Sequence, residues 1–301
     1  MKLNLAQKIQ TAFSAFRHKE ELKRLLIRRF WQQRKILEVN VSGVRAKFDT
    51  SDFLSNVFFW QSEFSGDYEP AVSQILGRLM QSSKVYADIG GNVGFFSVLP
   101  ALMNPGCKIF YFEMDRTIRP LLTRNMALNK LSADRITIVN TAVGDADGEI
   151  EYLPHPYSFL AKLGNENIDI YDLKYSAPLI TLDSYFLKEG VDPDLLKIDI
   201  DGAEMSALRG MSRILSDKRP DLLLEVHPAY LPQFGSTASE VHDFLKERGY
   251  RFFKITDFRN SKTSKLLEIF NFDDLATPTG DMLFVTMGDR HKMSDGELEI
   301  R

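Results

Sequence analysis

The chain has 301 residues, of which 44% are hydrophobic and 26% charged, and it carries a net charge of −3. These fractions are typical of a globular protein, which excludes a disordered or fibrous chain and fits one or two domains. A single cysteine, Cys107, excludes a disulfide scaffold and a cysteine-based zinc cluster, and it fits a reducing compartment. Because no apolar run approaches the ~18–20 residues of a membrane span, we expect a cytoplasmic protein.

Positive charge is concentrated at the start of the sequence. Residues 1–38 hold ten Lys or Arg against three Glu, a charge of +7, so the remainder carries −10. Their composition, without Pro or Gly, predicts a helical arm. The acidic remainder argues against a nucleic-acid partner. The arm has two interpretations. One is a helix on an anionic membrane surface, which would make the protein membrane-peripheral; the other, which we favour, is a helix packed on its own domain or on a second subunit of a homo-oligomer.

In chain order, the arm is followed by a short β segment and an aromatic stretch within residues 39–60, and then by an amphipathic helix over 70–80. From there, strands alternate with helices. The predicted strands are 84–89, 107–113, 135–141, 195–200 and 221–227, and the predicted helices are 93–103, 117–129, 203–216 and 237–248. Two stretches, 154–178 and 257–281, are predicted to be loops. Strands separated by helices indicate parallel βαβ units in an α/β sheet.

The most informative segment is the turn from Asp88 to Gly94, which reads Asp-Ile-Gly-Gly-Asn-Val-Gly. A short apolar strand ends here and a helix begins, so the backbone can approach a ligand closely and offer free N–H groups. A dinucleotide-binding turn requires G-x-G-x-x-G, but Asn92 stands where that pattern needs its second glycine. The turn therefore favours a ligand other than a nicotinamide dinucleotide.

Two carboxylates flank this turn. Asp88 precedes the first glycine by two residues and suits a ligand that carries an ammonium group. Glu113 ends the next predicted strand, 19 residues after Gly94, where an acidic residue can hold two ribose hydroxyls. A nucleoside that carries an amino acid satisfies both carboxylates, and S-adenosylmethionine is such a molecule.

A charged strand end follows within residues 195–204, which read Leu-Leu-Lys-Ile-Asp-Ile-Asp-Gly-Ala-Glu. Alternation along a strand predicts that Lys197, Asp199 and Asp201 share one side. Charged residues on a central strand are costly unless they are paired or belong to a site, so we expect Lys197 to pair with an Asp or with Glu204. Glu204 lies on the apolar stripe of the next helix and is expected to face the sheet.

The next strand carries Glu225 and His227 on one side of its carboxyl end, beside the charged strand. Asp199, Asp201, Glu225 and His227 are therefore the candidate catalytic residues. A divalent metal is an alternative use of these oxygen and imidazole groups. Their spacing matches none of the common metal templates, so we assign no metal ligand from the sequence.

Taken in order, these motifs resemble the FkbM family of S-adenosylmethionine-dependent methyltransferases, over roughly residues 65–255. The resemblance is carried by the turn 88–94, Phe112-Glu113, Asn125, Asn129, the Ala-Val-Gly-Asp of 142–145, the Thr-Leu-Asp of 181–183 and the charged string 197–204. It implies a Rossmann-like, doubly wound, mostly parallel seven-stranded sheet of the class I methyltransferase type, with an N-terminal helical extension. We assign residues 1–64 to this helical and β extension and residues 65–301 to the methyltransferase domain.

The family implies O-methylation of a hydroxyl on a sugar, a glycan or glycolipid, or a natural product. On this basis we expect Asp88 to bind the methionine amine, Gly90, Gly91, Asn92 and Gly94 to form the turn under the cofactor, Glu113 to bind the ribose, and Thr141 and Ala142 to flank the adenine. Asp199 is expected to line the methyl-transfer crevice. The general base is expected to be His227, Glu225 or Asp201, in that order.

Two other classes of protein stay open as alternatives. An NAD-dependent dehydrogenase would need the glycine that Asn92 replaces, and its fingerprint would fall nearer the start of the chain. A non-catalytic nucleotide-binding module would keep the glycine turn, but it has no use for carboxylates at the ends of two neighbouring strands. A cofactor-turnover assay separates this non-catalytic module from a methyltransferase.

Overall fold

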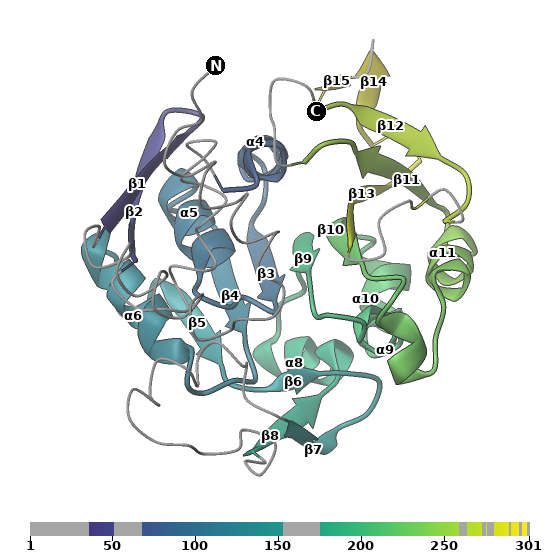
Figure 1. Ribbon diagram of the computed structural model, residues 1–301, viewed down its shortest axis with the longest axis horizontal. Helices are drawn as coiled ribbons and strands as arrows, with labels where there is room; N and C mark the ends of the chain where they lie inside the picture. Colours follow the sequence, from purple (N-terminus) through teal and green to yellow (C-terminus); the bar gives the residue numbers. More distant parts are fainter. Residues whose placement is uncertain are drawn as a thin grey trace, which may run out of the picture.

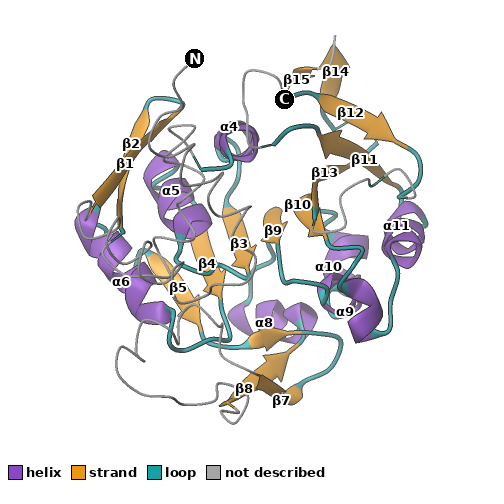
Figure 2. Ribbon diagram, in the orientation of Figure 1, coloured by secondary structure: helices purple, strands orange, loops and turns teal. Residues whose placement is uncertain are grey.

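The computed structural model describes residues 36–50, 68–152, 175–258, 264–272, 275, 280–288, 290–294 and 297–299 (Figures 1 and 2). Outside these residues lie residues 1–35 of the helical arm predicted over 1–38, the aromatic stretch after residue 50 and the segment 154–174. Within the described part of the chain, no helix is long and apolar enough to cross a bilayer.

One sheet of eight strands forms the centre of the molecule, in the order β12-β11-β13-β10-β9-β3-β4-β5. Its strands are β3 (Val85–Ile89), β4 (Lys108–Phe112), β5 (Ile136–Val139), β9 (Leu195–Ile198), β10 (Asp221–Val226), β11 (Tyr250–Ile255), β12 (Leu266–Ile269) and β13 (Asp281–Met287). From β5 to β10 every pairing is parallel, and β13 runs antiparallel between β10 and β11. This confirms the doubly wound, mostly parallel α/β fold.

The eighth strand is the edge strand β12, which lies within the stretch 257–281 that the sequence analysis assigned to a loop. Its four residues, Leu-Leu-Glu-Ile, are too few to show a strand period, and antiparallel pairing with β11 is what makes them a strand. Of the seven other strands, five (β3, β4, β5, β9 and β10) lie where the sequence predicted strands, whereas β11 and β13 were not placed from the sequence.

Helices cover both faces of the sheet because strand side chains alternate between two buried clusters. On β3, Tyr86 faces one cluster, whereas Ala87 and Ile89 face the other. The first cluster contains α4 (Pro70–Leu79), α5 (Phe95–Met103) and α6 (Arg119–Leu128). The second contains α8 (Leu182–Glu189), α9 (Glu204–Arg209), α10 (Ser212–Asp217) and α11 (Ala238–Lys246), on the other side in Figure 1.

The predicted helix over 203–216 is two helices, α9 and α10, with a break at Gly210. Here the backbone makes other hydrogen bonds: the Gly210 carbonyl accepts the N–H of Asp183 at 2.9 Å, and the Asp183 carboxylate accepts the N–H groups of Arg213 and Ile214. A side chain at 210 would lie 1.8 Å from the Gly144 oxygen. At the break, the backbone between α9 and α10 therefore hydrogen-bonds to the start of α8 instead of continuing a single helix.

A β-hairpin, β1 (Ile36–Val41) with β2 (Val44–Asp49), packs on α5 and α6 at the left of Figure 2. Residues 36–38 therefore belong to a strand and not to the predicted helical arm, since alternating burial from Ile36 to Val41 fits a strand with one buried face. Asn125 and Asn129 of α6 hold this hairpin. Asn125 Oδ1 accepts the N–H of Asp49, and Asn129 bonds both backbone groups of Lys47.

Two smaller sheets and one short helix complete the described structure. The small sheet β6-β8-β7 is built from β6 (Ala142–Val143), β7 (Gly148–Tyr152) and β8 (Tyr175–Ile180). The chain ends in the hairpin β14 (Lys292–Ser294) and β15 (Glu297–Glu299), and a 3₁₀ turn, η2 (Leu231–Phe234), follows β10. The strand predicted over 135–141 is shorter in the structure, where β5 ends at Val139. Thr141 follows it, and Ala142 begins β6 of the small sheet.

Candidate active site

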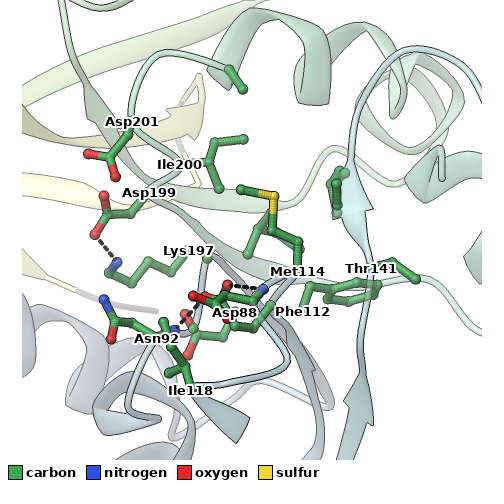
Figure 3. A pocket seen from close by; sticks show the side chains of 18 of the residues that line it. Asp88, Asn92, Phe112, Met114, Ile118, Thr141, Lys197, Asp199, Ile200 and Asp201 are labelled. Atoms are coloured by element: carbon green, nitrogen blue, oxygen red, sulfur yellow. Dashed lines mark hydrogen bonds and ion pairs between the residues drawn. The ribbon is translucent and has the colours of Figure 1, made fainter. Parts of the chain in front are cut away.

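The site lies at the carboxyl ends of β3 and β9. The strand order reverses here, because β4 and β5 follow on one side of β3, whereas β9 and β10 lie on the other. Such a switch point leaves a crevice outside the strand ends, where doubly wound sheets bind ligands. A pocket of about 410 Å³ occupies this position, and Figure 3 shows it from close by.

The pocket brings together most of the residues that the sequence singled out. Its lining includes Asp88, Gly90, Gly91, Asn92, Glu113, Thr141, Ala142, Asp199 and Asp201. Gly94 lies outside the lining, at the start of α5, where a side chain would meet Leu122 at 2.3 Å. Glu225 and His227 also lie outside it, behind Asp199.

The glycine turn is shaped by close packing. A side chain at Gly90, whose φ is +81°, would lie 2.0 Å from the carbonyl oxygen of Asp199, and one at Gly91 would meet the Tyr111 ring at 2.3 Å. Only glycine therefore lets the β3 turn pass so close to the end of β9. The turn is also fixed by the Tyr111 hydroxyl, which donates to the Asn92 carbonyl at 2.6 Å.

Asp88 is fully buried at the floor of the pocket. Its Oδ2 accepts the hydroxyl of Ser97 at 2.6 Å, whereas Oδ1 has no hydrogen-bond partner among the described residues. Burial raises the pKa of Asp88 to about 6, although Lys197 and Ser97 act in the opposite direction. A buried carboxylate oxygen without a partner is costly, so it suits a donor brought by a ligand.

Glu113 stands at the end of β4 and closes the glycine turn. Its Oε2 accepts the N–H of Asn92 at 3.1 Å, and its Oε1 accepts the N–H of Asp115 at 2.8 Å. Burial raises the pKa of Glu113 to about 7, against the effect of these two hydrogen bonds. The carboxylate is thus fixed in orientation at the pocket wall, where it can accept further hydrogen bonds.

Lys197 and Asp199 form an ion pair of 2.8 Å at the opposite side of the pocket, drawn as a dashed line in Figure 3. The ammonium group of Lys197 also lies 4.8 Å above the Phe96 ring. Burial disfavours the charged form of Lys197, but Asp199, Asp88 and other carboxylates outweigh it and raise its pKa. Burial likewise acts against the Asp199 charge, and Lys197 reverses that effect and lowers its pKa. The expected pairing of Lys197 with an Asp is confirmed.

Asp201 reaches the pocket from a turn and not from the strand. β9 ends at Ile198, and Asp201 and Gly202 take left-handed conformations with φ of 50° and 105°. The prediction that strand alternation places Asp201 on the side of Lys197 and Asp199 is therefore wrong, because Asp201 lies beyond the end of the strand. Its side chain is 78% exposed and lies beside Asp199 at the pocket edge (Figure 3).

His227 and Glu204 meet behind Asp199. His227 Nδ1 lies 2.8 Å from Glu204 Oε1, which also accepts the N–H of Gly202 at 2.9 Å. His227 Nε2 lies 3.6 Å from Glu225 and 3.7 Å from Asp201. Glu204 is fully buried, as expected from its helical stripe.

The carboxyl and imidazole groups here shift one another's pKa values. Burial and the neighbouring Asp199 charge raise the pKa of Glu225 to about 10. Burial lowers the pKa of His227, but the hydrogen bond to Glu204 and the Asp199 charge outweigh it, so the net shift is upward. Asp199, Glu225 and His227 each present a ligand atom, all within 4.8 Å of one another, and they could hold a metal ion.

Sequence reasoning missed three residues that shape this site. Ser97 and Phe96, in the first turn of α5, contact Asp88 and Lys197. Tyr68, just before α4, lines the pocket. Ser97 follows Asp88 by nine residues across a turn, and such a separation carries no periodic signal. Tyr68 belongs to the Tyr-Glu-Pro string at 68–70, which is part of the family resemblance, but no role in the site was assigned to it from the sequence.

The fold and the site define a class I methyltransferase: a doubly wound sheet with its pocket at the switch point, and acidic residues at the ends of β3 and β4. The chain belongs to the FkbM methyltransferase family, because the model of the Methyltransferase FkbM domain matches residues 88–252. The family inferred from the order of the motifs is confirmed.

Individual relatives are distant. The AMB antimetabolite synthetase AmbE of Pseudomonas aeruginosa is 27% identical over 210 residues; the match covers 58% of this chain but 10% of AmbE, so the chain spans a small part of that relative's length. Among solved structures, the methyltransferase FkbM from Methylobacillus flagellatus KT has 17% identity and a TM-score of 0.42, covering 67% of this chain and 43% of that chain. The SAM-dependent methyltransferase from Agrobacterium tumefaciens has 11% identity and a TM-score of 0.46, covering 84% and 70%.

Proposed function

We propose that this protein transfers the methyl group of S-adenosylmethionine to a hydroxyl group of a sugar, a glycan or glycolipid, or a natural product. One observation carries the proposal: a single pocket connects the carboxylates Asp88 and Glu113 with the carboxylates Asp199 and Asp201. The first pair suits the amine and the ribose of the cofactor. The second pair lies where an acceptor hydroxyl would have to lose its proton.

Each end of the pocket has a defined task in this proposal. Asp88 has a buried oxygen with no hydrogen-bond partner in the described part of the chain, and it accepts the ammonium group of the cofactor. Glu113, held by two backbone N–H groups, accepts the ribose hydroxyls. Thr141 and Ala142 flank the adenine, at the side of the pocket where Figure 3 shows Thr141. The glycine turn passes beneath the cofactor.

Methyl transfer itself is an in-line displacement at the sulfonium carbon. The acceptor oxygen forms its bond to the methyl carbon while the carbon–sulfur bond breaks, and the sulfonium charge disappears. The protein therefore contributes orientation and the removal of the hydroxyl proton. Proton removal falls to the group of side chains at the ends of β9 and β10, in which Asp199 and Asp201 border the pocket and Glu225 and His227 stand behind them.

Calorimetry with three ligands tests the proposal. We expect S-adenosylmethionine and its demethylated product, S-adenosylhomocysteine, to bind, and NAD not to bind. A screen of hydroxylated acceptors, glycans and glycolipids first, should then give methylated product by mass spectrometry. Tight NAD binding would revive the dehydrogenase alternative, and cofactor binding without turnover on any acceptor would favour the non-catalytic module.

The basic arm adds a proposal about partners. Residues 1–35 lie outside the described residues, so the two interpretations of the arm stand as predictions. We favour packing on the protein itself or on a second subunit over a membrane surface. Flotation with anionic liposomes decides between them: comparable flotation of the full chain and of a variant with the arm's Lys and Arg replaced by Gln supports packing, and flotation of the full chain alone supports a membrane-peripheral protein.

A further inference from the structure

We propose that Asp199, Glu225 and His227 form a binding site for one divalent cation of the Mg²⁺ and Mn²⁺ type at the inner end of the pocket. The three side chains come from the carboxyl ends of β9 and β10, which are neighbouring parallel strands. Their ligand atoms lie within 4.8 Å of one another. From the sequence, a divalent metal was an alternative use of these groups, and no ligand was assigned because their spacing matches none of the common metal templates.

The orientation of His227 is that of a metal ligand. Glu204 Oε1 already accepts the N–H of Gly202, so it is the acceptor toward His227 Nδ1, and Nδ1 carries the imidazole proton. Nε2 then has its lone pair free and lies on the side of Glu225 and Asp201. A carboxylate that fixes the second ring nitrogen in this way is the usual support of a metal-bound histidine.

The rest of the structure holds these ligands in place. The His227 ring stacks on Tyr230 at 5.7 Å between centroids, with 18° between the planes. Gly280 packs against both Glu225 and His227: a side chain at position 280 would be 2.5 Å from Glu225 Oε1 and 3.1 Å from the His227 ring. The side chains of Glu225 and His227 are 10% and 5% exposed, whereas Asp199, at 29%, borders the pocket. A cation bound here would thus be buried on the side of Glu225 and His227 and accessible from the pocket on the side of Asp199.

The charges around the site also call for a cation. Lys197 interacts with four carboxyl groups, those of Asp199, Asp88, Glu69 and Glu225, and its ammonium group is committed to Asp199 at 2.8 Å. Glu225 lies deeper, where its carboxyl group hydrogen-bonds that of Asp199 and lies 3.6 Å from His227 Nε2. Because the carboxyl groups of Asp199 and Glu225 adjoin, both can be ionised only beside a further positive charge. A divalent ion among these three side chains would supply it.

The donor set selects the class of ion. Two carboxylates and one imidazole fit Mn²⁺ or Mg²⁺, which favour oxygen ligands. Metal bonds of about 2.0–2.1 Å would place neighbouring ligand atoms about 3 Å apart, so the 3.6 Å between Nε2 and Glu225 has to shorten by about half an ångström. The remaining positions face the pocket, where water or an acceptor hydroxyl would complete the coordination.

Cation binding does not depend on the proposed function, but its chemical role rests on that function. An ion at this position would hold the acceptor oxygen and lower the pKa of its hydroxyl group. His227 Nε2 is then a ligand, and Asp201, at the pocket edge, is the carboxylate that takes the proton. The oxygen electron pair forms the bond to the methyl carbon, and the pair of the carbon–sulfur bond stays on sulfur.

Titration of the chelator-treated full chain with MnCl₂, followed by electron paramagnetic resonance of free Mn²⁺, tests the site. We expect one saturable Mn²⁺ per chain, displaced by Mg²⁺. Glu225→Gln and His227→Gln should each weaken binding by at least about tenfold, and Glu204→Gln, which removes the orienting carboxylate, by about tenfold as well. Glu189→Gln, an exposed carboxylate at the end of α8 and outside the pocket lining, is the matched control and should bind Mn²⁺ as the unchanged protein does.

S-adenosylhomocysteine affinity, measured on the same variants, reports whether they are folded and whether the cofactor proposal holds. Absence of saturable binding at millimolar Mn²⁺ in the unchanged protein would overturn the cation site while leaving the methyltransferase proposal standing. Mn²⁺ binding that survives in both ligand variants would place the ion elsewhere and would equally overturn it. Loss of Mn²⁺ binding with retained cofactor affinity supports it.

Discussion

His227 Nδ1 lies 2.8 Å from Oε1 of Glu204, and neither side chain is more than 5% exposed. The pair joins the end of β10 to the start of α9, the helix that follows the neighbouring strand β9. Because Glu204 fixes the ring, His227 presents Nε2 in one direction, toward Asp201 and Glu225. The pair therefore fixes the side chains at the part of the pocket where, in the proposed function, the acceptor hydroxyl loses its proton.

Replacement of His227 by Ala should reduce turnover by roughly 10²-fold or more, the usual contribution of a positioned acid–base group, while S-adenosylhomocysteine affinity stays within a factor of a few. The affinity should change little because His227 does not line the pocket. Steady-state kinetics with the acceptor found in the screen, together with calorimetry, measures both quantities. Glu247→Gln, an exposed change at the residue that follows α11, is the control.

Asp201→Asn separates the roles within this group. If Asp201 takes the proton, this variant loses turnover as strongly as His227→Ala but retains Mn²⁺ binding. Near-normal turnover in Asp201→Asn, with a large loss in His227→Ala that chelators do not reproduce in the unchanged protein, would return the proton to His227.

Glu113 should account for a measurable part of the cofactor affinity. In Glu113→Ala the ribose hydroxyls lose their acceptor and the Asn92 N–H loses its partner, so S-adenosylhomocysteine binding should weaken by ~1–3 kcal/mol. Isothermal titration calorimetry measures this difference. Glu189→Ala, an exposed carboxylate at the end of α8, should bind the ligand unchanged. Equal affinity in all three proteins would remove Glu113 from the cofactor site.

The affinity for the cofactor product should rise with pH up to about neutrality. In the cofactor-free protein the pKa of Glu113 is raised to about 7 and that of Asp88 to about 6, both by burial. Each carboxyl group accepts the ligand's donors when it is ionised, so affinity falls as pH decreases through these values. Calorimetry from pH 5 to pH 8 measures the profile. In Glu113→Ala the remaining rise should shift down toward the pKa of Asp88, and an unchanged profile would contradict the assignment.

The sequence predicted that Asp88, the glycine turn and Glu113 lie together at one end of the pocket, because the determinants of this arrangement are local. The turn 88–94 is one strand end, one glycine pair and one helix start, and Glu113 ends the adjacent parallel strand, so chain order alone brings them together. Strand register does the same for the ends of β9 and β10, and the expected neighbourhood of Asp199 and His227 follows from it.

What the sequence did not predict depends on backbone that leaves regular geometry. The left-handed residues Asp201 and Gly202 turn the chain after β9, and the Glu204 carboxylate then reaches His227, a partner we did not predict. A side chain at Gly202 would lie 2.7 Å from the backbone of Tyr230, so tertiary packing sets this turn. Periodicity carries no information on such a turn, nor on the break between α9 and α10.

The hairpin β1–β2 was outside the family resemblance, yet its buried residues share one hydrophobic cluster with α5 and α6. Asn125 makes the connection with its amide group, which is fully buried. Its Oδ1 accepts the N–H of Asp49 at 2.8 Å, and its Nδ2 donates to the carbonyl of Val93, the residue just before Gly94. One side chain thus links the hairpin to the glycine turn.

Asn125→Ala should therefore destabilise the protein by about 2–3 kcal/mol, because the half-buried N–H of Asp49 and the buried carbonyl of Val93 both lose their hydrogen bond to this side chain. Urea unfolding followed by circular dichroism measures the free energy of unfolding. Thr123→Ala, on the exposed side of the same helix, removes one long hydrogen bond to the Arg119 carbonyl and should change stability by less than about 0.5 kcal/mol. Since the Val93 carbonyl belongs to the turn under the cofactor, Asn125→Ala should also weaken S-adenosylhomocysteine binding, whereas Thr123→Ala should not. Equal stabilities for the two variants would show that the hairpin is held by its apolar face alone.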